Sequence, residues 1–170
     1  DEEKLKYVAD MNDPEVFGQE FYRMGFKEAI EKKILVDYQI IGVGVSDAGL
    51  QDAILNREFI DENSTVEEIA NNFAFNKTMS EHKANHAITF HSSIKKASTF
   101  KEKHLKLYPN IFTSHVSGKL TTNDRKKILD QFDSSKKAVV TNARCLTEGV
   151  DVPGIDLVYF CDPKNSKIDI

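Results

Sequence analysis

The chain has 170 residues, of which 40% are hydrophobic and 29% charged, and its net charge is −4 at pH 7. These values are typical of one soluble globular domain with a real core, with or without an attached arm. No window is apolar over the length that a membrane span needs, and no signal-peptide pattern opens the chain, so we expect no membrane partner. The two cysteines exclude a disulfide framework and a metal site of four cysteines, and they favour a reduced, cytoplasmic setting.

An acidic, loop-rich arm is predicted over residues 1–36, and it ends in the short helix FKEAIEKKI. The first residues, DEEKLK, are charged and contain no initiator methionine, so we expect an excised segment of a longer protein. A domain is predicted over residues 37–170. Its first regular segment is YQIIGVGV, which starts at Tyr38 and is rich in β-branched residues, and we expect it to be a strand.

Helices and strands alternate along the rest of the chain. STVEEIANNFAF predicts a helix whose capping box is either Ser64 with Glu67 or Thr65 with Glu68. The segments that follow are the strand HAITFH, the helix SSIKKASTFKEKHLKLY, the strand IFTSHV, the helix TTNDRKKILDQF and the strands KAVVTN and DLVYFC. Apolar strands separated by amphipathic helices predict an α/β fold, doubly wound, with a mostly parallel sheet and helices on both faces. The order of the strands is not visible in the sequence.

In such sheets, ligands bind at the carboxyl ends of the strands. This rule selects residues 91–93, 115–119 and 141–151 as one candidate surface. The second of these leads into a helix that begins at Thr121 or Thr122, and the free N–H groups of that helix, together with Lys119 and Arg125, suit a phosphate. The alternative is an ordinary capped helix with Asp124 against its dipole.

Positive charge is concentrated between His91 and Lys137. This stretch holds eleven Lys and Arg against four Asp and Glu, a balance of +7 that leaves −11 for the rest of the chain. An anionic partner would account for the asymmetry, but two lysine-rich solvated helix faces account for it more simply. HKANH places His82 and His86 four residues apart without the glutamate of a zinc protease, so we expect unrelated surface histidines and no metal site.

Three segments in order resemble the second RecA-like domain of a superfamily 2 helicase or translocase. ITFHSSIKKA resembles motif IV, and HVSGKLTTNDRKKILDQF resembles the turn and helix before motif V. VVTNARCLTEGVDVPGIDLVYFCDP resembles motif V itself and is close to the common form T-x-x-x-x-x-E-G-x-D-x-P. The arm resembles, more loosely, the connector of restriction-enzyme-type DNA helicases. The resemblance implies that residues 1–36 connect to a first motor domain and that residues 37–170 stop just before motif VI, Q-x-x-G-R-x-x-R.

The resemblance also implies residue roles. Thr141 would bind a backbone phosphate, Gly149 would allow close approach, Asp151 would face the nucleotide or the opposite domain, and Glu148 matches the acidic residue of the subgroup. The nucleotide-cleft and coupling residues implied are Glu148, Gly149 and Asp151. The nucleic-acid-binding residues implied are His91, Ser92, Ser93, Gly118, Lys119, Arg125, Thr141 and Asn142. The implied cofactor is ATP with Mg²⁺, whose ligands belong to the first domain, so no catalytic residue is expected in this chain.

The function implied is that of the C-terminal motor domain of an ATP-dependent DNA helicase or translocase of the restriction type, inactive when isolated. Expected partners are DNA in preference to RNA, the first RecA-like domain, and nuclease or methyltransferase modules. One alternative is a non-enzymatic α/β binding module with a basic rim. Another is a small phosphate-binding enzyme, which is weaker because no catalytic constellation is visible. An upstream phosphate loop and a downstream Q-x-x-G-R in the gene would favour the motor.

Overall fold

The computed structural model describes residues 13–44, 46, 51, 65–143 and 154–162 of the chain. Contacts divide the chain into two units, Asp1–Gly42 and Val43–Ile170. Within the described part, no helix is long and apolar enough to cross a membrane.

The first unit contains two short helices, α1 (Pro14–Phe17) and α2 (Phe26–Glu31). The helix predicted from FKEAIEKKI is therefore confirmed as α2. Helix α1 was not expected, and it forms because Asp13 accepts a hydrogen bond from the backbone N–H of Glu15 while Pro14 opens the first turn.

The strand predicted from YQIIGVGV is wrong for the residues that the structure describes. Residues 38–44 form no strand, and the side chain of Ile40 is 87% exposed. A β-branched run has only a preference for extended backbone, and a strand exists only where a neighbour supplies a ladder of hydrogen bonds. No described strand pairs with this segment.

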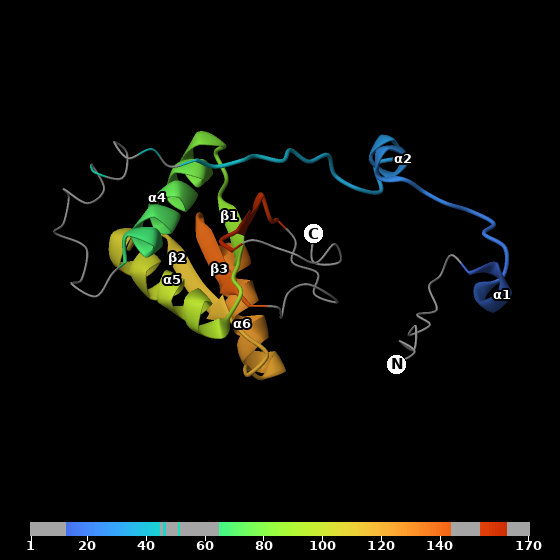
Figure 1. Cartoon of the computed structure of the whole chain (residues 1–170). Coiled ribbons are helices and arrows are strands. Elements are labelled where there is room, and N and C mark those ends of the chain that lie inside the picture. Colours follow the sequence, from blue (N-terminus) through green and yellow to red (C-terminus); the bar gives the residue numbers. More distant parts are fainter. Residues whose placement is uncertain (1–12, 45, 47–50, 52–64, 144–153, 163–170) are drawn as a thin grey trace, which may run out of the picture. The chain divides into compact units, whose positions relative to one another are not determined.

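The second unit is built on a four-stranded parallel sheet in the described residues (Figure 1). Its strands are β1 (His86–Phe90), β2 (Phe112–Val116), β3 (Ala138–Asn142) and β4 (Leu157–Phe160). The spatial order is β2-β3-β1-β4, and each neighbouring pair is parallel. The strands predicted from HAITFH, IFTSHV, KAVVTN and DLVYFC are thus confirmed. β3 is buried along its whole length because it lies inside the sheet.

Three of the helices that the structure describes cover the two faces of this sheet (Figure 1): α4 (Val66–Glu81), α5 (Ile94–Leu107) and α6 (Thr122–Ser134). Alternate residues of β3 point to opposite faces. Val139 packs in one apolar cluster with residues of α4 and α5, whereas Ala138 and Val140 pack in another with Phe132 of α6. The predicted α/β fold with helices on both faces is confirmed.

The helix starts agree with the caps expected from the sequence. Thr65 and Glu68 form the capping box of α4, which decides between the two boxes considered. Thr121, not Thr122, caps α6 and accepts from the N–H of Asp124. Helix α4 ends at Glu81, so His82 and His86 share no helix face, and His86 opens β1 instead.

Candidate functional site

The carboxyl ends of β1, β2 and β3 meet at one edge of the sheet, which we call the rim. Phe90 of β1 and Val116 of β2 are both in register with Asn142 of β3. The N–H of His91 donates to the carbonyl of Asn142 at 2.9 Å, which continues the β1–β3 ladder one residue further. The carboxyl ends of β1, β2 and β3 therefore lie side by side.

Thr141 and Asn142 lie beneath the rim, because both are fully buried. The hydroxyl of Thr141 is 3.0 Å from Nδ1 of His115, its partner in register on β2. Burial lowers the pKa of His115, although its hydrogen bond to the Thr141 backbone acts in the opposite direction. The sequence placed His115 among the strand-end residues but gave no sign that it orients Thr141.

His91 is also buried, with 3% of its surface exposed. Its Nε2 lies 2.9 Å from the hydroxyl of Thr89, and its ring packs against Phe100 with centroids 5.0 Å apart. Burial lowers the pKa of His91 to about 4, against the attraction of Asp162. His91 is therefore neutral at pH 7 and brings no positive charge to the rim.

Ser92 and Ser93 occupy the short connection between β1 and α5. Ser93 caps α5 by accepting from the N–H of Lys96 at 3.2 Å. The N–H of Ser92 donates to Oδ2 of Asp162 at 2.8 Å, and the same carboxylate is paired with Lys96. The sequence analysis did not single out Asp162. Its position directly after the segment DLVYFC, in the Asp-Pro that ends the motif V segment, was the available signal.

Gly118 and Lys119 are exposed on the turn after β2, and Arg125 lies in the first turn of α6. A side chain at Gly118 would meet no neighbour within 4 Å, and its φ is not positive, so the backbone does not require glycine there. Nε of Arg125 is buried and has no hydrogen-bond partner among the described residues. Lys119 and Arg125 are thus the cations that the rim presents next to the end of β2.

Glu148, Gly149 and Asp151, which the resemblance assigns to the nucleotide cleft, lie outside the described residues. Among the residues that are described, no three His, Cys, Asp or Glu side chains come together in a way that could hold a metal ion.

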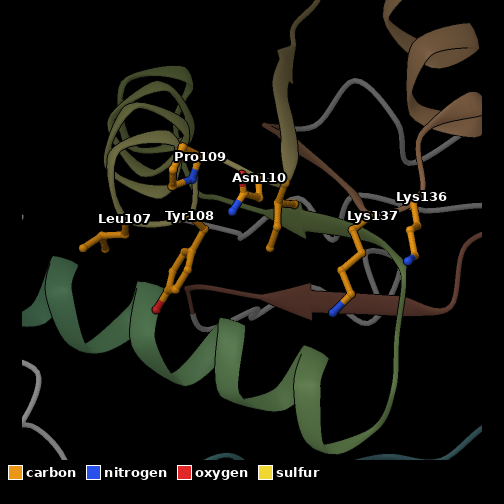
Figure 2. A pocket seen from close by; sticks show the side chains of 7 residues that line it. Leu107, Tyr108, Pro109, Asn110, Lys136 and Lys137 are labelled. Atoms are coloured by element: carbon orange, nitrogen blue, oxygen red, sulfur yellow. The ribbon is translucent and has the colours of Figure 1, made fainter.

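Among the described residues, one cavity lies at each of two opposite edges of the sheet. The larger, of about 420 Å³, is at the amino ends of β2 and β3 and is lined by Tyr108, Lys136 and Lys137 among others (Figure 2). The smaller, of about 260 Å³, is at the rim between α4 and α5, and His91, Lys96 and Asp162 contribute to its wall. The rim is the better candidate site despite the smaller cavity, because parallel sheets bind ligands at their carboxyl edge.

Residues 65–170 match the family described as the helicase conserved C-terminal domain. The chain belongs to this family. Two proteins named probable helicase A859L, from two isolates of African swine fever virus, are 28% and 30% identical to it, each over 94% of the chain. The ATP-dependent rRNA helicase SPB4 of Eremothecium gossypii is 41% identical over 36% of the chain and 10% of its own length.

The chain spans only 18% of the length of the viral relatives. A solved structure, the C-terminal domain of the Sulfolobus solfataricus SWI2/SNF2 ATPase, aligns with a TM-score of 0.47 and 14% identity, over 82% of this chain and 58% of that one.

Proposed function

We propose that this helicase C-terminal domain is the second RecA-like motor domain of an ATP-dependent helicase or translocase that holds nucleic acid by its backbone. The observation that carries the proposal is the meeting of three strand ends at one rim, with Ser92, Lys119 and Arg125 around it. A motor must bind every sequence, so it needs hydroxyls, N–H groups and cations for phosphates and not groups that read base edges.

Burial separates the residues predicted to contact nucleic acid into those that can reach a ligand and those that can only support the rim. Thr141, Asn142 and His91 are buried, and we assign them to fixing the strand ends and the segments that leave them. We assign the direct phosphate contacts to Ser92, Lys119 and Arg125. Arg125 suits this task because it lies in the first turn of α6 and a guanidinium matches phosphate geometry.

For the nucleotide side, the proposal follows the motif V resemblance. Asp151, Glu148 and Gly149 would line one wall of a cleft that binds ATP with Mg²⁺, and a first RecA-like domain would supply the opposite wall. When bound, ATP would supply the phosphoryl-transfer energy, and the contribution of this chain would be to link the cleft to the nucleic acid through the segment after β3.

The substrate that we propose is DNA, in a protein of the restriction type that can carry nuclease or methyltransferase modules. The support is the resemblance of residues 1–36 to the connector of such proteins. One relative is by name an rRNA helicase, so RNA is the substrate to test against DNA.

The test is a comparison of two double variants. Lys119→Ala with Arg125→Ala removes two cations from the rim, and Lys136→Ala with Lys137→Ala removes two from the opposite edge. Affinity for fluorescein-labelled single strands of DNA and of RNA is measured by anisotropy over a salt series. We expect the rim variant to bind more weakly and to flatten the slope of log K against log salt by about 1.4, or about 0.7 per phosphate contact.

The control variant should keep the slope of the unchanged protein. Equal losses from the two pairs would contradict a localised rim site, because general electrostatic attraction would then explain the binding. Complete absence of binding would favour the non-enzymatic binding module. Equal affinity for DNA and RNA would remove the preference for DNA while leaving the motor domain in place.

A further inference from the structure

The connection between β1 and α5 is held at both ends. Its first residue, His91, belongs to the β1–β3 ladder through the hydrogen bond to the carbonyl of Asn142. Its last residue, Ser93, caps α5. Ser92 lies between them and takes part in neither the ladder nor the helix. Its backbone N–H is therefore available for a hydrogen bond to a group from elsewhere in the fold.

Asp162 provides that partner from the far side of β1. The N–H of Cys161 donates to the carbonyl of Phe90 at 3.0 Å, so the end of β4 is anchored to β1 immediately before Asp162. From this position Oδ2 accepts from the N–H of Ser92 at 2.8 Å, and Oδ1 accepts from Nζ of Lys96 in the first turn of α5. The carboxylate thus joins the end of β4 to the connection and to the helix that follows it.

The charges of Asp162 and Lys96 agree with this link. Burial raises the pKa of Asp162, but the hydrogen bonds from Lys96 and from Ser92 outweigh this effect and hold the pKa below its usual value. The hydrogen bond to Asp162 raises the pKa of Lys96. Both groups are charged at neutral pH, with the Asp162 side chain 12% and the Lys96 side chain 56% exposed. Lys96 is therefore already paired with Asp162, in an ion pair that is partly open to solvent.

We propose that Asp162 is a positioning residue, which holds Ser92, Ser93 and the start of α5 in the single arrangement that meets the nucleic-acid backbone. The inference rests on the proposed function of the rim. The same contacts allow an opposite role, in which Asp162 competes with phosphate for Ser92 and Lys96. The two roles predict opposite effects of removing the carboxylate.

Asp156 offers a matched control for the substitutions. Its Oδ2 accepts hydrogen bonds from the N–H groups of Asn85 and His86 at 2.8 and 3.1 Å. Asp156 therefore links the start of β4 to the backbone at the start of β1, as Asp162 links their ends. It does this at the amino end of β1, the edge opposite the rim. The variants are Asp162→Ala, Asp162→Asn, Asp156→Ala and Asp156→Asn, each made in the whole protein.

The first measurement is hydrogen–deuterium exchange of the peptide that contains Ser92. We expect Asp162→Ala to speed exchange there about ten-fold, because a charge-assisted hydrogen bond to that N–H is lost. Asp156→Ala should speed exchange at Asn85 and His86 and leave Ser92 unchanged. Unchanged exchange at Ser92 in Asp162→Ala would overturn the proposal, whatever the binding data show.

The second measurement is affinity for a fluorescein-labelled single strand over a salt series. We expect Asp162→Ala to bind about five- to ten-fold more weakly, since one ordered hydrogen bond is lost. Asp162→Asn keeps an oxygen for Ser92 and releases Lys96, so it should recover most of the affinity and steepen the salt slope by about 0.7. Both Asp156 variants should keep the affinity and the slope of the unchanged protein.

The outcomes separate the two proposals. Binding by Asp162→Ala that equals or exceeds that of the unchanged protein overturns positioning and establishes competition. If the unchanged protein binds no nucleic acid, the proposed function fails and the role of Asp162 at the rim falls with it. In that case the exchange data still decide whether the carboxylate holds Ser92.

Discussion

His115 and Thr141 are partners across the β2–β3 ladder, with Nδ1 of the imidazole 3.0 Å from the Thr141 hydroxyl and 3.1 Å from the Thr141 carbonyl oxygen. A carbonyl oxygen only accepts hydrogen bonds, so Nδ1 carries the proton. Nε2 is buried and has no hydrogen-bond partner among the described residues. This histidine therefore holds the threonine at the end of β3 in one orientation.

Replacement of His115 tests that relationship. His115→Ala leaves the Thr141 groups without their buried donor, so we expect a loss of about 1–3 kcal/mol in the free energy of unfolding. His115→Asn carries an N–H close to the place of Nδ1 and should lose less. Urea denaturation of the three proteins measures the difference. Equal stability of the alanine and asparagine variants would argue against a role for the donor.

Acidification should destabilise the fold below pH 6.5. Burial lowers the pKa of both His91 and His104 to about 4. Between pH 6.5 and about 4 the unfolded state therefore binds protons that the folded state does not. The contribution of the two neutral histidines to the free energy of unfolding is fully present above pH 6.5. As the pH falls from 6.5 to about 4, the free energy of unfolding should decrease by up to about 1.4 kcal/mol per pH unit for each histidine.

The measurement is the urea midpoint as a function of pH for the unchanged protein and for His104→Asn. The asparagine variant should show a shallower decline because one buried histidine is absent. His82→Gln, a change at an exposed histidine, is the control. A decline of the same steepness in His104→Asn would assign the acid sensitivity to other groups.

Phe132 anchors α6 in the apolar cluster on its face of the sheet. It is fully buried and packs with Val116, Val140 and Ile88. Phe132→Ala should cost about 3–5 kcal/mol in the free energy of unfolding, because it removes a buried ring and leaves a cavity. Phe21→Ala, at a fully exposed phenylalanine, should change it by less than about 0.5 kcal/mol. Calorimetry or urea denaturation measures both.

ATP hydrolysis is the fourth expectation. Residues 1–170 alone should hydrolyse ATP no faster than buffer, because phosphoryl transfer needs a phosphate cradle, Mg²⁺ ligands and an arginine finger that the resemblance assigns to other segments. In the whole protein, Asp151→Ala should lower nucleic-acid-stimulated turnover and leave the thermal midpoint unchanged. A phosphate-release assay measures the rates. Robust hydrolysis by residues 1–170 would refute the assignment of the phosphate cradle, the Mg²⁺ ligands and the arginine finger to other segments.

The elements that the sequence predicted correctly are those whose signals are local. Ser93 and Thr121 mark helix starts because a cap needs only the next turn of backbone, and the apolar run at Val139 marks a strand because its neighbours share its burial. YQIIGVGV carried the same kind of signal and forms no strand over residues 38–44. Its failure shows that propensity without a pairing partner does not make a strand.

By itself, then, the sequence determined the alternation of helices and strands and the parallel α/β fold, because hydrophobic period and capping act over a few residues. Only the tertiary structure decided the order β2-β3-β1-β4 and the burial of His91, Thr141 and Asn142. It alone joined Asp162 to Ser92, which is 70 residues earlier in the chain. Hydrogen bonds between distant segments depend on which strands become neighbours, and no local pattern encodes that choice.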